Sequence, residues 1–117
     1  MKQLSVEMVA RIAERFRGLA DETRIRILLR LQGDECNVST LAEELTVAQA
    51  SISKHLSVLR QLGYIQMRRE GVQAFCSIRD PALPQLCQLM CDGVTRHAHE
   101  EHAALGLAPA KAKPRTR

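Results

Sequence analysis

The fold of this chain is decided by residues 38–62, VSTLAEELTVAQASISKHLSVLRQL. This stretch predicts a short helix, a tight connection and a second helix. The apolar side chains of the second helix recur at helical spacing and share one stripe: Ile52, Leu56, Leu59 and Leu62. The opposite side carries short polar groups and one cation: Gln49, Ser53, Lys54 and Ser57. Such a helix suits the major groove of DNA, although a helix with a solvated face has the same pattern.

Two further helices are predicted before this stretch. Residues 5–17 place a set of apolar side chains on one face: Val6, Val9, Ile12, Ala13 and Phe16. Asp21 is the expected N-cap of a helix that runs through Leu31 and ends before Gly33. The side chains expected on its buried side are Leu19, Ile25, Leu28, Leu29 and Leu31.

The two central helices have candidate caps. Residues 34–38 leave room for a short strand before Ser39, which is the expected N-cap of the first of these helices. Residues 46–49, Thr-Val-Ala-Gln, match a capping box that begins the second, and Gly63 is expected to end it.

The side-chain pattern changes after the second central helix. Residues 64–69 and 73–78 alternate on either side of a glycine-bearing turn, which predicts a β-hairpin with Arg68 and Arg69 near its tip. Asp80-Pro81 then gives an N-cap and a proline for the start of a last helix, expected to end near residue 104. The predicted fold is mainly α with a small β-hairpin, a winged helix-turn-helix of order α-α-α-α-β-β-α.

Composition favours one small domain. The 117 residues are expected to form a DNA-binding and dimerisation domain over residues 1–104 and a basic disordered tail over residues 105–117. The chain has 17 Lys and Arg against 13 Asp and Glu, and the four basic residues of the tail account for the whole excess. Only local clustering of charge can therefore indicate nucleic-acid binding.

No apolar run reaches the roughly 18 residues of a membrane span, and the first residues lack a signal-peptide block. We expect a cytoplasmic protein with no membrane partner and with reduced cysteines.

The hairpin favours DNA binding over a merely solvated helix face. A helix in the major groove leaves a neighbouring hairpin over the phosphates or in the adjacent minor groove, where arginine is favoured. The side chains expected to form one cationic surface are Lys54, Arg60, Arg68 and Arg69.

Four segments resemble the ArsR/SmtB family of bacterial winged-helix repressors: LADETRIRILLRL (19–31), VSTLAEEL (38–45), ASISKHLSVLRQLGYI (50–65) and RREGVQAFCSI (68–78). The resemblance covers about residues 8–95 and is most specific from Ser53 to Gly63. It implies a homodimer through the first and last helices, bound to an inverted-repeat operator in double-stranded DNA. The DNA contacts that it implies are Gln49, Ser51, Ser53, Lys54 and His55 on the recognition helix, with Arg68 and Arg69 on the wing. His55 is equally suited to hold its helix to a backbone carbonyl.

The inducer sites of the family do not carry over. Arsenic and cadmium sensors have a Cys-Val-Cys-Asp-Leu motif, and alignment on Val38 and Leu41 puts Asn37 and Ser39 at its two thiol positions. The Asp-x-His motif of the zinc sensors is broken after Asp92.

Cys87 and Cys91 are the first candidate sensor thiols. They lie four residues apart on the predicted last helix and therefore share a face. Thiolates suit arsenite or another thiophilic metal ion, and two close thiols suit a disulfide or polysulfide bridge. Cysteine is also a common small buried hydrophobe, so a structural role stays open.

Cys36 and Cys76 are a second candidate pair of sensor thiols. The short strand before the first central helix is expected to edge the hairpin, which brings Asn37 opposite residues near Phe75. The histidines near the end of the last helix, with Glu101, are a third candidate, for a metal ion: His97, His99 and His102. Helix-end histidines also interact with the helix dipole without binding a metal.

These observations predict a DNA-binding transcriptional repressor, not an enzyme, that requires no cofactor. It releases its operator when cysteine thiols sense a thiophilic metal or metalloid, such as arsenite, or a reactive sulfur or oxidant species. One alternative is a response to a zinc-type metal through the C-terminal histidines. Another is a protein-interaction winged helix without DNA binding. A small thiol enzyme is disfavoured because the sequence has no Cys-x-x-Cys motif and no obvious general base beside its thiols.

Overall fold

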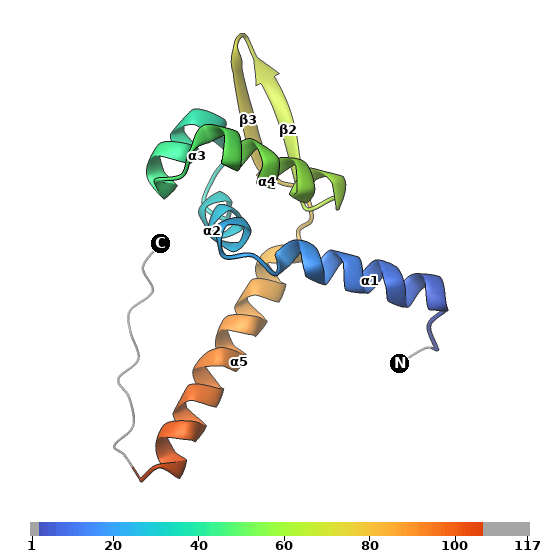
Figure 1. Ribbon diagram of the computed structural model, residues 1–117, viewed down its shortest axis with the longest axis vertical. Coiled ribbons are helices and arrows are strands. Elements are labelled where there is room, and N and C mark those ends of the chain that lie inside the picture. The colour runs from blue at the N-terminus through green and yellow to red at the C-terminus, as the bar shows by residue number, and fades with distance from the viewer. Residues whose placement is uncertain (1–2, 107–117) are drawn as a thin grey trace. The chain divides into compact units, whose positions relative to one another are not determined.

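The computed structural model describes residues 3–106 (Figure 1). The elements in chain order are α1 (Val6–Leu19), α2 (Glu22–Leu31), β1 (Cys36–Asn37), α3 (Val38–Leu45), α4 (Gln49–Gln61), β2 (Ile65–Glu70), β3 (Gln73–Ile78) and α5 (Leu83–Ala104). The predicted order of helices and hairpin is confirmed, and β1 is the short strand expected before the first central helix. The chain divides into two compact units, of which the first ends at Asp80 and the second begins at Pro81. Residues 107–117 of the predicted tail lie outside the described residues.

Helices α1 and α2 begin at side-chain caps. Ser5 Oγ accepts a hydrogen bond from the Met8 amide at 3.1 Å, and the carboxylate of Asp21 accepts one from the Arg24 amide at 3.0 Å. The predicted cap at Asp21 is confirmed. Because each cap satisfies an amide that has no partner within its helix, it fixes the residue at which the helix begins.

The buried side of α2 differs from the prediction. Ile27, Leu28 and Leu31 are buried, whereas Ile25 and Leu29 are 42% and 52% exposed. The sequence pattern could not distinguish these two stripes, because apolar residues occur on both. Helix α2 contacts α3, α4 and β3, and this packing selects the stripe that contains Ile27.

The predicted caps of the two central helices are wrong. Asn37, not Ser39, caps α3: its side-chain oxygen accepts from the Thr40 amide at 2.7 Å and from the Ser39 hydroxyl at 3.0 Å. Thr46 has a φ of 56° and ends α3, so it cannot begin α4. Helix α4 starts after Ala48, and no described side chain caps it. Its start is set by the packing of its buried stripe, Ile52, Leu56 and Leu59.

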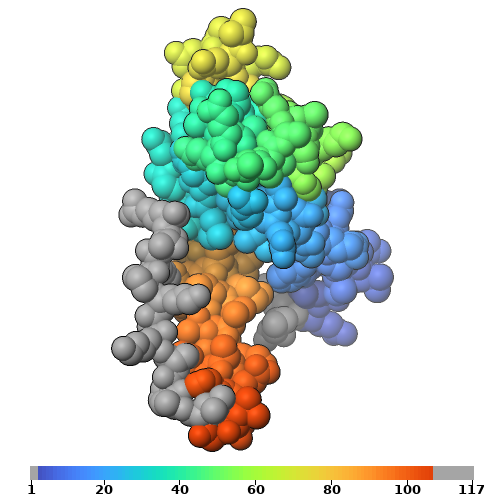
Figure 2. Space-filling view, turned by 60° about the vertical axis from the view of Figure 1, so that its left-hand side comes forward, coloured from blue at the N-terminus to red at the C-terminus, as the bar shows by residue number. Residues whose placement is uncertain are grey.

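The sheet is antiparallel, with strand order β1-β3-β2. Gly71, with a φ of 62°, provides the left-handed residue of the tight turn between β2 and β3. The register pairs Asn37 with Phe75, as expected, and pairs Cys36 with Cys76. The turn of the hairpin projects beyond α3 and α4, and in Figure 2 it is the yellow tip above the teal and green helices.

Arg15 of α1 contacts residues near the end of the first unit. Its guanidinium lies 4.3 Å from the centroid of the Tyr64 ring and donates to the carboxylate of Asp80 at 3.0 Å. The predicted N-cap at Asp80 is wrong, because the helix begins three residues later. Helix α5 instead begins at Leu83, with Ala82 as its N-cap and a proline in its first turn. No helix among residues 3–106 is long and apolar enough to cross a membrane.

Candidate nucleic-acid interface

Helix α4 presents two sides of opposite character. Ile52, Leu56 and Leu59 are buried against the core. The side chains of Gln49, Ser53 and Lys54 are exposed, and Ser51 is half-buried. The predicted division of this helix into an apolar and a polar side is thus the observed one. Short hydrogen-bonding groups on an exposed helix match what the base edges of a major groove require.

A groove of about 550 Å³ lies between α4 and the hairpin. Its polar lining comes from α4, the hairpin and the start of α3: Asn37, Ser39, Gln49, Ser53, Ser57, Arg60, Arg69 and Gln73. Its apolar lining is Val38, Leu56, Met67, Val72 and Ala74. Arg60 and Arg69 therefore place two positive charges along one groove, although they come from different elements.

Arg68 and Arg69 are neighbours in sequence but have different surroundings. Side chains alternate along a strand, so Arg69 shares the groove side of β2 with Met67 while Arg68 projects from the other side. No ion pair of residues 3–106 includes Arg60 or Arg69. The structure thus brings Arg60 and Arg69 together and separates Arg68 from them.

Arg68 is held by two carboxylates and one ring. Its guanidinium donates to both carboxylate oxygens of Glu35, with Nε to Oε2 at 3.0 Å, and to Glu70 Oε2 at 2.8 Å. It also lies 4.5 Å from the centroid of the Phe75 ring. The hydrogen bonds that Arg68 donates to Glu35 and Glu70 raise the pKa of Arg68, and the guanidinium lowers the pKa of Glu35. The charge of Arg68 is therefore neutralised within the protein.

His55 faces α2. Its Nδ1 lies 3.2 Å from Arg24 Nη1 and 3.8 Å from Asp21 Oδ2. Arg24 also donates through Nε to the Gly18 carbonyl at 2.6 Å, so His55 joins α4 to the junction of α1 and α2. An acceptor role for Nδ1 requires a neutral ring with its proton on Nε2. The partner of His55 in this structure is thus a guanidinium and not a backbone carbonyl.

The four cysteines are free thiols in two different settings. Cys36 and Cys76 are buried opposite each other in the sheet, and the Cys76 thiol donates to the Cys36 carbonyl at 3.3 Å. Burial raises the pKa of Cys76 to about 11 and also raises the pKa of Cys36. Cys87 is half-buried and Cys91 exposed, one turn apart on α5, and burial raises the pKa of the Cys87 thiol.

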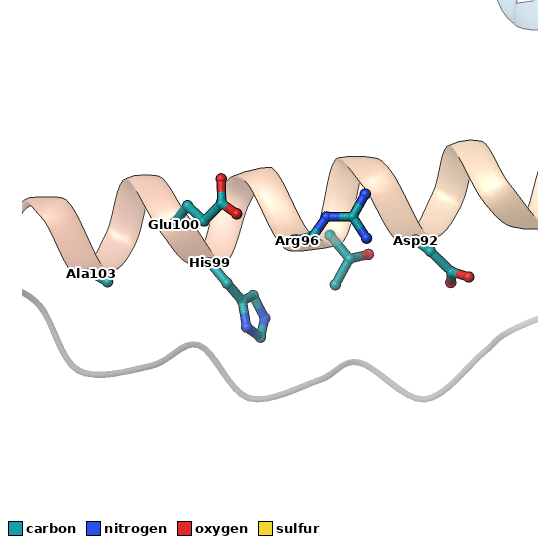
Figure 3. A pocket seen from close by; sticks show the side chains of 6 residues that line it. Asp92, Arg96, His99, Glu100 and Ala103 are labelled. Carbon is teal, nitrogen blue, oxygen red and sulfur yellow. The ribbon is translucent and has the colours of Figure 1, made fainter.

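The histidines of α5 do not gather in one copy of the chain. His97 Nε2 lies 3.1 Å from Glu101 Oε1, and both side chains are exposed. Within residues 3–106, no three His, Cys, Asp or Glu side chains lie close enough to hold a metal ion. Figure 3 shows His99 on the same helix as Asp92, Arg96 and Glu100, beside a hollow whose lining residues all belong to α5. A hollow lined by a single helix offers few converging groups to a ligand.

Three features of this interface were not predicted from the sequence. Gln73 and Met67 line the groove, and Glu35 is the partner of Arg68. Because side chains alternate along a strand, the predicted strand could have placed Arg68 and Arg69 on opposite faces. Glu35 could not have been found from local pattern, because its contact depends on β1 lying beside β3.

A three-stranded wing packed beside a two-helix motif with an exposed polar helix defines a winged helix-turn-helix DNA-binding protein. The chain belongs to the ArsR family: residues 21–67 match the family described as "Bacterial regulatory protein, arsR family". It is similar to the HTH-type transcriptional regulator KmtR of Mycobacterium tuberculosis, with 34% identity over 101 residues that cover 86% of this chain and 73% of that protein.

Two further proteins match over most of this chain. The chain is 33% identical over 89 residues to the cadmium resistance transcriptional regulatory protein CadC homolog of Staphylococcus aureus, covering 74% of this chain and 73% of that protein. The crystal structure of Rv0081 from M. tuberculosis matches with a TM-score of 0.77 at 28% identity, over 83% of this chain and 98% of that one. The chain is therefore a transcriptional regulator and not an enzyme, as predicted.

Proposed function

We propose that this chain is a homodimeric repressor that binds an inverted-repeat operator in double-stranded DNA in the cytoplasm. The observation that carries the proposal is the groove beside α4, where Arg60 and Arg69 flank the polar side chains of the helix. Positive charge on both sides of an exposed polar helix suits a phosphate backbone that passes along a major groove. A winged helix that binds only proteins would not require these two arginines beside the exposed helix.

The proposed DNA contacts divide into two kinds. Base edges in the major groove are contacted by side chains of α4: Gln49, Ser51, Ser53 and Lys54. Arg60 and Arg69 contact the phosphate backbone or the adjacent minor groove. His55 and Arg68 act by position, since His55 contacts Arg24 and Arg68 is held by Glu35 and Glu70.

A second copy of the chain is the proposed partner of the exposed apolar side chains. On α1 these are Val6, Val9, Ile12 and Phe16, and on α5 they are Leu89, Met90 and Val94. Monomeric proteins rarely leave contiguous apolar patches exposed, so helices of this kind indicate an interface. A dimer through α1 and α5, within a domain of residues 1–104, presents two copies of α4 to half-sites one helical turn apart, about 34–36 Å.

The proposed inducer is a thiophilic metal or metalloid, such as arsenite, or a reactive sulfur or oxidant species. Cys87 and Cys91 support this proposal because they lie one turn apart on the dimer-forming α5. The relative from S. aureus, named for cadmium resistance, makes a thiophilic metal a reasonable class of inducer. Chemical modification of Cys87 and Cys91, or binding of a metal ion to them, changes the spacing of the two α4 helices in the dimer. This change lowers the affinity for the operator.

The test begins with selection of binding sites from a random DNA pool by the reduced full-length protein. We expect the protein to select an inverted repeat. The wild-type protein and the control variant Arg17→Ala should bind it equally, because Arg17 is an exposed cation away from the groove. Lys54→Ala is expected to weaken binding by about 10- to 100-fold, the range of one good base contact. Failure to select any sequence, or undiminished binding by Lys54→Ala, would contradict the proposal.

The inducer is tested on the selected DNA. The protein is challenged in parallel with arsenite, zinc, sulfane sulfur and peroxide, and DNA release is followed by fluorescence anisotropy. The same series is repeated with Cys87→Ser and Cys91→Ser. We expect release by a thiol-directed agent in wild type and its loss in these variants. Release by zinc alone, unaffected by the cysteine variants, would overturn thiol sensing and favour the histidines of α5.

A further inference from the structure

The register of the sheet aligns three sulfur-containing side chains. Cys36 on β1 pairs with Cys76 on β3, and Cys76 pairs with Met67 on β2. Because β3 is the central strand, these residues form one row across the sheet. Directly opposed residues of antiparallel strands project from the same face, with Cβ atoms about 4.5–5.5 Å apart. Two thiols and a thioether therefore line the same face of the sheet.

We propose that Cys36, Cys76 and Met67 form a binding site for a soft monovalent cation, Cu(I). Thiolate and thioether ligands select Cu(I) over harder ions. Zinc normally takes four ligands, and within residues 3–106 no three His, Cys, Asp or Glu side chains gather to provide them. The donor set thus fits a two-thiolate, one-thioether site.

The surroundings of the row suit a buried metal centre with an entrance. Cys36 is 4% exposed and Cys76 is fully buried, so water is excluded from the two thiols. Met67 is half-buried and lines the groove beside α4, which gives an ion a route from solvent. Arg30 lies near both cysteines, but it is already paired with Glu44.

The binding step releases protons. Cys36 and Cys76 are free thiols when no metal is bound. One Cu(I) replaces two thiol protons, which pass to the solvent, and no electron is transferred. Because the ligand thiols must lose their protons, the apparent affinity for Cu(I) rises with pH.

Occupation of the site reaches the DNA-binding elements directly. Cys36 precedes Asn37, which caps α3, and Met67 and Arg69 lie on the groove side of β2. An ion held by the three side chains ties β1 to both strands of the hairpin and draws Met67 from the groove lining. We expect operator affinity to fall. This consequence rests on the proposed function, whereas the metal site does not.

The experiment uses the full-length protein with Cys87→Ser and Cys91→Ser, which removes the other thiol pair. The protein is titrated anaerobically with Cu(I) against the chromophoric competitor bicinchoninate. X-ray absorption reports the number of sulfur ligands, and circular dichroism confirms the fold of each variant. We expect one Cu(I) per chain with three sulfur ligands, and no stoichiometric binding after Cys36→Ala or Cys76→Ala.

Met67→Leu tests the thioether and preserves side-chain volume, with Met90→Leu on α5 as its matched control. We expect Met67→Leu to weaken binding more than about tenfold, since even the loss of an outer partner of a metal ligand costs 10- to 100-fold. The number of sulfur ligands should fall to two. The proposal is overturned if the folded starting variant binds no Cu(I), if Met67→Leu behaves as Met90→Leu, or if Zn(II) displaces Cu(I) at equal concentration.

Operator binding is measured separately in the same starting variant. Cu(I) binding without any specific DNA binding would leave the metal site standing and remove the proposed repressor function. Specific DNA binding without Cu(I) binding would do the reverse.

Discussion

Arg68 of the wing donates hydrogen bonds to both carboxylate oxygens of Glu35, which lies 33 residues earlier in the chain. The pair joins β2 to the segment that leads into β1 and α3. Charge-assisted hydrogen bonds of this two-pronged form fix orientation as well as distance. The contact therefore sets the angle of the wing relative to the helix-turn-helix motif, while the adjacent Arg69 keeps its charge for a partner.

Arg69→Ala and Arg68→Ala are expected to differ in the salt dependence of DNA binding. Removal of one phosphate contact lowers the slope of log affinity against log salt by about one. We expect this change for Arg69→Ala and no change of slope for Arg68→Ala, whose guanidinium is neutralised by Glu35 and Glu70. Fluorescence anisotropy over a range of salt concentrations measures both slopes. Equal loss of slope in the two variants would show that Arg68 also contacts phosphate.

The pKa of Glu35 provides a pH test of the same contact. The hydrogen bonds from Arg68 lower this pKa below its ordinary value of 4.5. Because the folded pKa is depressed, the ion pair contributes stability at pH values above 4.5 and loses that contribution as the pH falls through the lowered pKa.

An NMR titration of the Glu35 carboxyl carbon is the measurement. Its midpoint is expected below 4.5 in the wild-type protein and near 4.5 in Arg68→Ala. Glu7, an exposed carboxylate on α1, serves as the internal reference in both proteins. A Glu35 midpoint that Arg68→Ala leaves unchanged would contradict the contact.

His55→Ala is expected to lower stability and to leave the salt slope of DNA binding unchanged. The side chain joins α4 to Arg24, so its loss should reduce the free energy of unfolding by about 1 kcal/mol, the typical contribution of one hydrogen bond. Urea denaturation gives the stability, and anisotropy gives the slope. The opposite pattern, with unchanged stability and a slope lower by about one, would identify His55 as a phosphate contact.

Phe16→Glu is expected to dissociate the proposed dimer. Phe16 is 54% exposed on the apolar side of α1, and a buried charge without a partner is strongly unfavourable at an interface. Val72→Glu, at the exposed hairpin turn, is the matched control and should leave the assembly intact. Sedimentation velocity distinguishes the two states. A Phe16→Glu protein that sediments as wild type does would exclude this face of α1 from the interface.

The elements and their order follow from local sequence signals. The apolar stripe of α4, the cap at Asp21 and the turn at Gly71 depend on residues a few positions apart, and these local signals sufficed. The same signals failed at Ser39, because Asn37 caps α3 in its place, and at Thr46, because that residue ends α3 in a left-handed conformation.

Tertiary structure alone decided which functional side chains are available and which are engaged. Three such relationships join residues that are far apart in the chain. They are the pairing of Arg68 with Glu35, the contact of His55 with Arg24, and the row of Cys36, Cys76 and Met67. Each depends on how helices pack, on the placing of β1 beside β3 or on the register of β2. Helical and strand periodicities describe neighbours along the chain, so they place a side chain on a face but cannot name the side chain that it meets.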